Sequence, residues 1–305
     1  MVKMDDTWQE KLRRVYRRLL PVPIRRPIGQ FRDWLAARQW AYLAGHRTKV
    51  LQDLGGGLQM FLYTDSELSR LIRLENFSAT ERWFTREFLR PRDVYVDVGA
   101  NAGLFTLTAA QAVGSSGRVF GFEPSPLMFS RLQENVALNG FRNVSCHQLA
   151  LSSGEGEAEM AVARDEHDGW SSLAGPRAGA AFKSETVRTS TWARFATENG
   201  LVGRVALMKM DVEGWERQVL LGGREVFARA DAPVLYVEFT DRAAGGPSCA
   251  QLYALLEELG FGLYAVDLER RAVISAPRQA AYADVNLVAA KDPQKVNERL
   301  SRTNR

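Results

Sequence analysis

Residues 94–105 are the stretch that most constrains the fold of this chain. A short β-branched and aromatic run, Val94 to Val98, leads into the turn Gly99-Ala100-Asn101-Ala102-Gly103 and then into an apolar helical segment that reaches Val113. A strand that enters a glycine turn and then a helix is typical of sites that present backbone N–H groups to a nucleotide-like ligand. Glycine suits such a turn because a side chain would block the ligand or prevent the turn. We therefore expect a ligand at this turn.

A second acidic position follows at the spacing of a βαβ unit. Residues 117–122 have the composition of a strand, and Glu123 stands at its end, 24 residues after Gly99. A carboxylate at this place can accept two hydrogen bonds from a ribose diol, and the expected spacing is roughly 20 residues. The pair of segments predicts a ribose-containing ligand.

The turn excludes two common nucleotide sites. A dinucleotide fingerprint would need glycine at positions 99, 101 and 104, but Asn101 and Leu104 occupy the last two. A phosphate-binding P-loop would need Gly-Lys-Ser/Thr after the turn, which is absent. A ligand with a ribose and no pyrophosphate fits better, and S-adenosylmethionine is the common one.

Several further motifs resemble the FkbM family of methyltransferases. Asp97-Val98-Gly99-Ala100-Asn101-Ala102-Gly103 resembles the first family motif, Asp-x-Gly-Ala-Asn-x-Gly, and Phe122-Glu123-Pro124 resembles the second. Lys209-Met210-Asp211-Val212-Glu213-Gly214-Trp215-Glu216 resembles the Lys-x-Asp-x-Glu-Gly-x-Glu box, and Asn139-Gly140, Ala150-Leu151 and Val237-Glu238-Phe239 continue the pattern. The resemblance runs from about residue 75 to residue 290.

The resemblance implies a Rossmann-like class I methyltransferase that uses S-adenosylmethionine. The expected reaction is O-methylation of a hydroxyl on a sugar or glycan, with a polyketide-type or other secondary metabolite as the alternative acceptor. An N-methyltransferase fits less well, because Asp211-Val212-Glu213-Gly214 stands where amino-directed enzymes carry an Asn-Pro-Pro-Tyr type motif. A binding module with an inactive Rossmann core is disfavoured by Gly99, Asn101, Gly103 and Glu123.

Strand and helix patterns alternate along the core, which predicts an α/β fold with a mostly parallel sheet covered on both faces. We expect seven strands, at residues 94–98, 117–122, 143–148, 204–210, 234–239, 261–266 and 286–290. A hairpin is expected at 48–65 and helices at 67–90, 125–140 and 248–260. The glycine-rich residues 153–190 form a less regular insertion and are expected to act as a substrate lid.

The charge divides the chain into segments. Residues 1–50 contain twelve Lys/Arg and four Asp/Glu, a net charge of +8, whereas the whole chain carries +4. We expect a basic helical extension at 1–47, with helices at 7–19 and 28–44, then a methyltransferase domain at 48–290 and a frayed polar tail at 291–305. The extension can pack as a cap, lie on an anionic membrane or bind nucleic acid. Nucleic acid is the least favoured of the three.

No apolar run approaches the roughly 18 residues of a transmembrane helix, and the N-terminus lacks the apolar core of a signal peptide. Cys146 and Cys249 have no metal-ligand spacing and suggest no disulfide framework. We therefore expect a cytoplasmic protein whose partner is a small-molecule or glycan acceptor, with peripheral membrane contact through residues 1–47 as a further possibility.

The expected site lies at the carboxyl ends of the strands, where ligands of open α/β sheets bind. Lys209, Asp211 and Glu213 alternate along an extended segment and should share one face, with Asp211 as the first candidate for a base and Glu238 as the second. Asp211 and Glu238 could instead bind Mg²⁺. Lys209 and Glu213 have the structural alternative of an ion pair at the Gly214 turn, and Glu216 that of a surface charge or helix-terminal contact. The expected cofactor-binding residues are Asp97, Gly99, Ala100, Asn101, Gly103, Glu123, Pro124, Ala150 and Leu151.

Overall fold

The computed structural model describes residues 37–75, 77–163, 171–175, 182–241 and 249–301. The chain divides into two compact units, residues 1–77 and 78–305. This boundary differs from the expected start of the methyltransferase domain at residue 48, and those domain limits stay a prediction. The helix expected at 7–19 and residues 28–36 of the helix expected at 28–44 lie outside the described residues, and residues 37–44 are helical as expected.

The first unit contains a helix at residues 37–46, a hairpin and a second helix. Strands β1 (Lys49–Gly55) and β2 (Leu58–Tyr63) pair antiparallel around the glycine turn, which confirms the expected hairpin. Helix α3 (Glu67–Glu75) follows, and its Ser69 hydroxyl accepts a hydrogen bond from the Tyr63 amide at 3.0 Å. In the first helix the Trp40 side chain is buried and Tyr42 is exposed.

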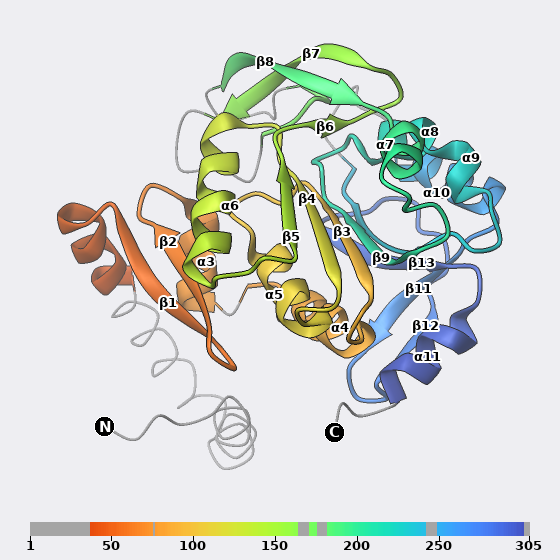
Figure 1. The fold of residues 1–305 in the computed structure, drawn as a ribbon, viewed down its shortest axis with the longest axis horizontal. Coiled ribbons are helices and arrows are strands. Elements are labelled where there is room, and N and C mark those ends of the chain that lie inside the picture. Colours follow the sequence, from red (N-terminus) through yellow and green to blue (C-terminus); the bar gives the residue numbers. More distant parts are fainter. Residues whose placement is uncertain (1–36, 76, 164–170, 176–181, 242–248, 302–305) are drawn as a thin grey trace. The chain divides into compact units, whose positions relative to one another are not determined.

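The second unit is built on a sheet of eight strands within the described residues (Figure 1). Its strand order is β12-β11-β13-β10-β9-β3-β4-β5. The strands are β3 (Val94–Val98), β4 (Arg118–Phe122), β5 (Val144–His147), β9 (Val205–Met210), β10 (Val234–Phe239), β11 (Gly262–Asp267), β12 (Ala272–Ser275) and β13 (Val285–Ala290). The run from β10 to β5 is parallel, whereas β13, β11 and β12 add antiparallel pairs at one edge. The expected mostly parallel sheet is confirmed, but the count of seven strands missed β12.

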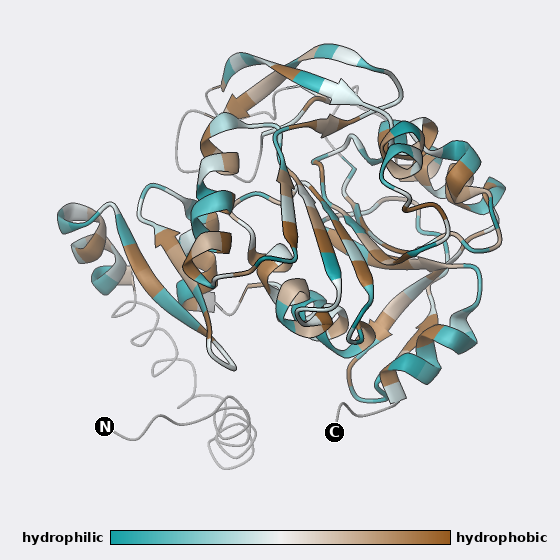
Figure 2. Ribbon diagram, viewed as in Figure 1, coloured by the Kyte–Doolittle hydropathy of each residue, from teal (hydrophilic) through white to brown (hydrophobic). Residues whose placement is uncertain are grey.

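Helices cover both faces of this sheet. One face packs against α7 (Trp192–Glu198), α8 (Glu216–Gly222), α9 (Arg224–Phe227) and α10 (Cys249–Glu258). The other packs against α4 (Ala79–Phe88), α5 (Leu104–Val113) and α11 (Pro293–Ser301), and α6 (Pro126–Leu138) brings Leu132 close to Gly121 of β4. Hydrophobic residues gather on the strands between these layers (Figure 2). The alternation of side chains along each strand supplies an apolar row to both faces.

Two expectations about the periphery are wrong. Residues 291–305 were expected to fray, yet 293–301 form helix α11, whose Val296 and Leu300 are buried because they repeat at helical spacing. Residues 153–190 were expected to be irregular, yet strands β7 (Gly156–Ala163) and β8 (Phe182–Ser190) pair along their length. With β6 (Ala150–Leu151) they form a small sheet in the order β6-β8-β7.

The small sheet lies near the carboxyl end of the main sheet, because β6 begins three residues after β5 ends. Figure 1 shows it at the top of the view. Its inner side chains, Met160, Val162 and Val187, pack on Ala150 in a separate apolar cluster. A backbone contact also joins this region to α8: a Cβ added at Gly222 would lie 1.9 Å from the carbonyl oxygen of Ser152.

The contact between Gly222 and Ser152 predicts that a methyl group added at position 222 destabilises the fold. Gly222→Ala should lower the free energy of unfolding by about 1–3 kcal/mol or more, because the clash is with backbone and cannot be relieved by a rotamer change. Urea denaturation measures this loss. Gly154→Ala is the matched control, since a Cβ at Gly154 has no atom within 4 Å, and it should change stability by no more than about 0.5 kcal/mol. Equal effects of the two substitutions would contradict the interpretation.

Candidate functional site

The turn between β3 and α5 uses its backbone N–H groups internally. The amides of Gly99 and Ala100 both donate to the Phe122 carbonyl, at 3.0 and 2.9 Å. The Asn101 amide donates to Glu123 Oε2 at 2.8 Å, the Ala102 amide to Asn101 Oδ1, and the Gly103 amide to the Ala100 carbonyl. Phe122 and Glu123 at the end of β4 thus accept from three of these amides, and atoms of the turn itself accept from the other two. A contact of the turn with the cofactor stays a prediction.

Gly99 is required by a close backbone approach. Its φ of 81° lies in the left-handed region, and an added Cβ would lie 1.9 Å from the carbonyl oxygen of Asp211. The Asp211 amide in turn donates to the Val98 carbonyl at 3.0 Å. The backbone at the end of β3 is thus locked to the residue that follows β9, which brings the first motif and the Lys209–Glu216 box together. From the sequence, a glycine here was expected for the ligand or for the turn, and the structure adds the contact with Asp211.

Glu123 joins two turns. Its side chain is 7% exposed, and its carboxylate accepts from the Asn101 amide through Oε2 and from the Ser125 amide through Oε1, the latter at 2.9 Å. Pro124 lies between these contacts, and α6 begins at Pro126 as expected. A carboxylate can accept about four hydrogen bonds, so two amides do not by themselves exhaust it. Glu123 therefore fits the ribose of S-adenosylmethionine in chemistry and in place.

Asp97 is fully buried on the α5 face of β3. Its Oδ2 accepts a 2.6 Å hydrogen bond from the Thr106 hydroxyl, and its Oδ1 has no hydrogen-bond partner of normal geometry among the described residues. Burial raises the pKa of Asp97 to about 6, although the charge of Lys209 opposes that rise. The role of Asp97 as a cofactor-binding residue stays a prediction.

Lys209 and Asp211 form the ion pair at the centre of the box. Lys209 Nζ donates to Asp211 Oδ2 at 2.6 Å and lies 4.4 Å from the centre of the Phe105 ring. The lysine side chain is 3% exposed and the aspartate side chain 34% exposed. Burial alone would lower the pKa of Lys209, but the charges of Asp211, Asp97 and Glu238 raise it. Burial raises the pKa of Asp211, but the ammonium of Lys209 outweighs this and lowers it, so Asp211 is an ionised, accessible carboxylate.

Glu238 complements Asp211 from the adjacent strand. It lies at the end of β10, and the Thr240 hydroxyl donates to its Oε1 at 3.0 Å. Burial and the negative charge of Asp211 raise the pKa of Glu238 well above its usual value, which favours the protonated form. One carboxylate is thus held ionised and its neighbour neutral, the arrangement by which paired acids divide their roles.

Glu213 brings a third carboxylate to this place. One oxygen from each of Asp211, Glu213 and Glu238 lies within 4.8 Å of the others. Such oxygens are the ligands that Mg²⁺ prefers. Lys209 already pairs with Asp211, and the binding of Mg²⁺ by Asp211 and Glu238 stays a prediction. Glu213 also has a φ of 55°, so residues 209–213 do not continue as the extended segment that we expected.

Glu216 organises the turn that carries Glu213. Its side chain is buried, and its Oε1 accepts from the amides of Val212 and Gly214 at 2.9 and 3.3 Å. Burial raises its pKa to about 7. Of the two structural alternatives, the helix-terminal contact is confirmed and the surface charge is wrong. An ion pair of Lys209 with Glu213 was the structural alternative for this turn. Instead, Lys209 pairs with Asp211, and Glu216 accepts from the amides of the turn.

The structure adds Ser172 to the site. Its buried hydroxyl donates a 2.6 Å hydrogen bond to the carbonyl of Glu213 and accepts one from the Ala174 amide. A bridge between Ala161 and Ser172 also fixes this residue to β7. Sequence reasoning placed Ser172 in the insertion without a role, because the contact spans 41 residues. No signal in the sequence distinguishes Ser172 from the neighbouring Ser171.

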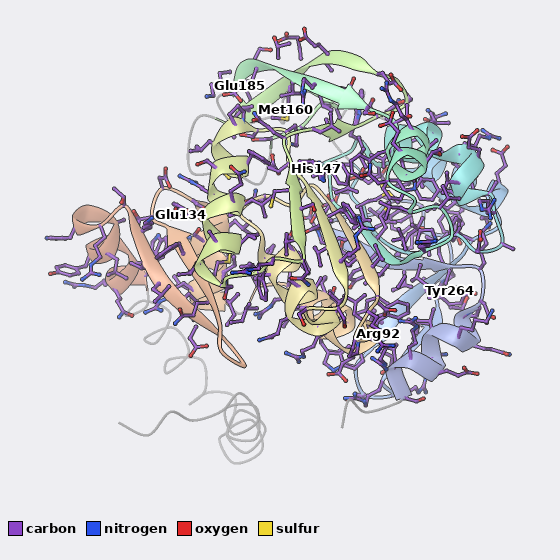
Figure 3. All side chains as sticks on the ribbon, viewed as in Figure 1. Arg92, Glu134, His147, Met160, Glu185 and Tyr264 are labelled. Atoms are coloured by element: carbon purple, nitrogen blue, oxygen red, sulfur yellow. The ribbon has the colours of Figure 1, made fainter. Side chains whose placement is uncertain are left out.

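The expected adenine-flanking residues are buried. Ala150 and Leu151 form β6 and pair with Thr189 and Ser190 of β8, and next to them Ser152 accepts a 3.2 Å hydrogen bond from Trp215 Nε1. Nearby, His147, which Figure 3 labels, ends β5. Its ring stacks on that of Phe122. Burial lowers the pKa of His147, which favours the neutral ring. The contact of Ala150 and Leu151 with adenine stays a prediction.

Comparison with known proteins identifies the family. Residues 97–263, more than half of the chain, match the methyltransferase FkbM domain. A 31-O-demethyl-FK506 methyltransferase FkbM from Streptomyces tacrolimicus is 30% identical over 219 residues, which cover 61% of this chain and 80% of that protein. A hexuronic acid methyltransferase AglP from Haloferax volcanii is 28% identical over 196 residues, with 64% and 75% covered. A methyltransferase 1 from Beauveria bassiana is 32% identical over 144 residues, which cover 42% of this chain and 57% of that protein.

Two of the solved structures to which the chain is similar are methyltransferases. A methyltransferase FkbM from Methylobacillus flagellatus has a TM-score of 0.40 and 14% identity, with 73% of this chain and 54% of that chain covered. An S-adenosylmethionine-dependent O-methyltransferase from Thermotoga maritima has a TM-score of 0.39 and 14% identity, with 79% and 76% covered. Within the described residues, no helix is long and apolar enough to cross a membrane.

The order of the strands, the glycine turn at the end of β3, the acid at the end of β4 and the match to the family domain agree with one another. The chain therefore belongs to the FkbM family and is an S-adenosylmethionine-dependent methyltransferase with a Rossmann-like class I fold.

Proposed function

We propose that this protein methylates a hydroxyl group of a sugar or glycan, with Asp211 as the base that receives the hydroxyl proton. The observation that carries the proposal is the accessible carboxylate of Asp211, held ionised by buried Lys209 at the carboxyl edge of the sheet. S-adenosylmethionine supplies a methyl group that is already activated on a sulfonium, so the protein has mainly to position and deprotonate the acceptor.

The residues of the site take distinct roles. When bound, S-adenosylmethionine would supply its methyl group to the acceptor oxygen, and Asp211 would receive the hydroxyl proton. Glu238, in its protonated form, can donate a hydrogen bond to Asp211 or to a neighbouring acceptor hydroxyl. Glu213 lies beside both carboxylates and is placed to accept from a further hydroxyl of the acceptor. Glu123 binds the cofactor ribose, and Gly99, Ala100, Asn101, Gly103 and Pro124 shape the turn around it.

The relatives support O-methylation and leave two acceptor classes. One relative is named for a hexuronic acid and another for a demethylated FK506. We favour a sugar, because adjacent carboxylates suit the several hydroxyls of a sugar, and we keep a polyketide-type or other secondary-metabolite hydroxyl as the second candidate. The basic residues 1–47 favour an acceptor presented at an anionic membrane surface.

An acceptor panel tests this function. Purified protein and cofactor with a labelled methyl group should transfer label to neutral sugars or nucleotide sugars. Transfer to hexuronic acids should be weaker, because Asp211 and Glu213 would repel a second negative charge. The position of the label is checked by mass spectrometry. Transfer only to macrolide-type hydroxyls would favour the second candidate, and transfer to amines would refute O-methylation.

Cofactor binding tests the role of Glu123. Glu123→Ala should weaken S-adenosylhomocysteine binding by about 1.5–3 kcal/mol, the range for hydrogen bonds to a charged group. Because Glu123 also joins two turns, stability is measured alongside by thermal denaturation. A 3′-deoxyribose analogue of the ligand provides the control: the natural protein should discriminate against it, and the variant should not. A variant that still discriminates would remove Glu123 from the ribose site.

Turnover tests the role of Asp211. Asp211→Asn should leave cofactor affinity within about twofold and lower turnover by about 10²–10⁴, the usual contribution of a positioned base. Asp231→Asn is the control, since that exposed residue pairs with Arg229 and should leave turnover unchanged. Near-normal turnover of the Asp211 variant would show that this residue is structural. Loss of activity in EDTA with recovery in Mg²⁺ would assign the carboxylates to a metal.

A further inference from the structure

Glu213 has a backbone conformation that a glutamate adopts only at a cost in free energy. Its φ of 55° lies in the left-handed region, and Gly214 after it has a φ of 92°. In this region the Cβ of any residue except glycine comes too close to a backbone carbonyl oxygen, so the conformation persists only where neighbouring groups enforce it. A glycine at position 213 would adopt the same φ freely, as Gly214 does. The path of the chain therefore does not need a glutamate here.

Hydrogen bonds fix both ends of the peptide group between Glu213 and Gly214. The Ser172 hydroxyl donates to its carbonyl oxygen at 2.6 Å, and Glu216 Oε1 accepts from its N–H at 3.3 Å. Glu216 Oε1 also accepts from the Val212 amide at 2.9 Å, so Glu213 lies between two bound amides. Because a peptide group is planar, these contacts set its orientation as a whole and with it the ψ of Glu213.

The donor of the carbonyl contact, Ser172, is itself held in place. Its side chain is 2% exposed, and its hydroxyl accepts from the Ala174 amide at 2.9 Å. Its backbone exchanges two hydrogen bonds of 2.9 Å with Ala161 of β7. None of these contacts involves the Glu213 side chain. The small sheet thus presents a fixed hydroxyl to the backbone of the residue that lies beside the acids.

We propose that Ser172 is a positioning residue for the acceptor site, which holds Glu213 in its left-handed conformation so that the Glu213 carboxylate lies beside Asp211. The inference rests on the proposed function, in which Glu213 accepts from a further hydroxyl of the acceptor. One oxygen of Glu213 lies within 4.8 Å of oxygens of Asp211 and Glu238. With a negative φ the side chain would leave the backbone in another direction, and this contact with the acceptor would be lost. The cost of the conformation is thus the cost of acceptor binding.

A pair of variants at position 213 tests the enforced conformation without any acceptor. Glu213→Gly and Glu213→Ala both lack the carboxylate, and only alanine keeps a Cβ. The glycine variant should melt about 2–4 °C above the alanine variant. The matched control is Glu257 in helix α10, where the order should reverse because glycine weakens a helix. A glycine variant at 213 that melts no higher than the alanine variant would overturn the proposal.

Kinetics of Ser172→Ala test the positioning role with the acceptor that takes up label fastest in the panel. The KM for this acceptor should rise about 3–10-fold, the fold-change expected for one neutral hydrogen bond. The kcat should stay within about threefold and the Kd for S-adenosylhomocysteine within about twofold, because Glu213 binds a hydroxyl that does not react. Ser171→Ala is the matched control, since the Ser171 hydroxyl accepts from the Ala163 amide, and its KM should be unchanged. An unchanged KM for Ser172→Ala would overturn the proposal.

A double-variant cycle separates positioning of Glu213 from anchoring of the small sheet. Glu213→Gly keeps the backbone carbonyl, so Ser172 can still bind it. If Ser172 acts through the Glu213 side chain, Ser172→Ala should raise the acceptor KM no further in the Glu213→Gly background. The same rise in both backgrounds would show that Ser172 only anchors the small sheet.

The proposed function and this inference fail in different ways. If Asp211→Asn keeps near-normal turnover, the assignment of the base is wrong. If Asp211→Asn loses turnover while Ser172→Ala keeps the acceptor KM, only the positioning role of Ser172 is wrong. If Ser172→Ala does not fold, Glu213→Gly decides: it should fold and raise the acceptor KM about 10–100-fold, the range for a hydrogen bond to a charged group. An unchanged KM in that variant would overturn the inference.

Discussion

The site depends on one close contact between two pieces of backbone. Gly99 lies so near the carbonyl of Asp211 that a side chain cannot be placed between them, and the Asp211 amide is hydrogen-bonded to Val98. This contact joins the turn after β3, where the cofactor is expected, to the end of β9, where the accessible acid lies. The distance between the proposed cofactor site and the proposed base, Asp211, therefore depends on a backbone contact. Such a contact is stiffer than a contact between two side chains. In-line methyl transfer needs such fixed geometry, because small displacements cost much of the rate.

The charges around this contact are arranged in a series. Buried Lys209 pairs with Asp211, Glu238 lies on the adjacent strand, and Glu216 binds the amides of the turn that carries Glu213. A buried ion is costly unless it is paired and hydrogen-bonded. The partner of Lys209 is the half-buried carboxylate of Asp211, whose pKa the lysine lowers. The neutral state of Glu238 follows from the same cost, since a second charge beside Asp211 would have no cation to balance it.

The sequence predicts the positions of the main strands better than it predicts the contacts between side chains. The strands from 94–98 to 286–290 were placed correctly because their apolar runs are long and are bounded by Gly, Pro and polar turns. The short, partly exposed β12 has no such pattern, and the β7–β8 pair was missed because the charges within it and the glycines around it are typical of loops. The shared face of Lys209 and Asp211 follows from alternation, but their ion pair and the burial of Asp97 and Glu216 do not. Burial is set by helices α5 and α8 packing onto the sheet, and a single sequence does not reveal which carboxylates they cover.

The hydrogen bond between Ser172 and the Glu213 carbonyl has a consequence for how the family can diversify. The small sheet is an addition between β5 and β9, and among the contacts described here one hydroxyl joins it to the backbone beside the acids. An attachment through a main-chain carbonyl does not depend on which side chain occupies position 213. A different side chain at position 213 would therefore leave this attachment in place. In protein engineering, the side chain beside the acids could then be varied without losing the anchor of the small sheet.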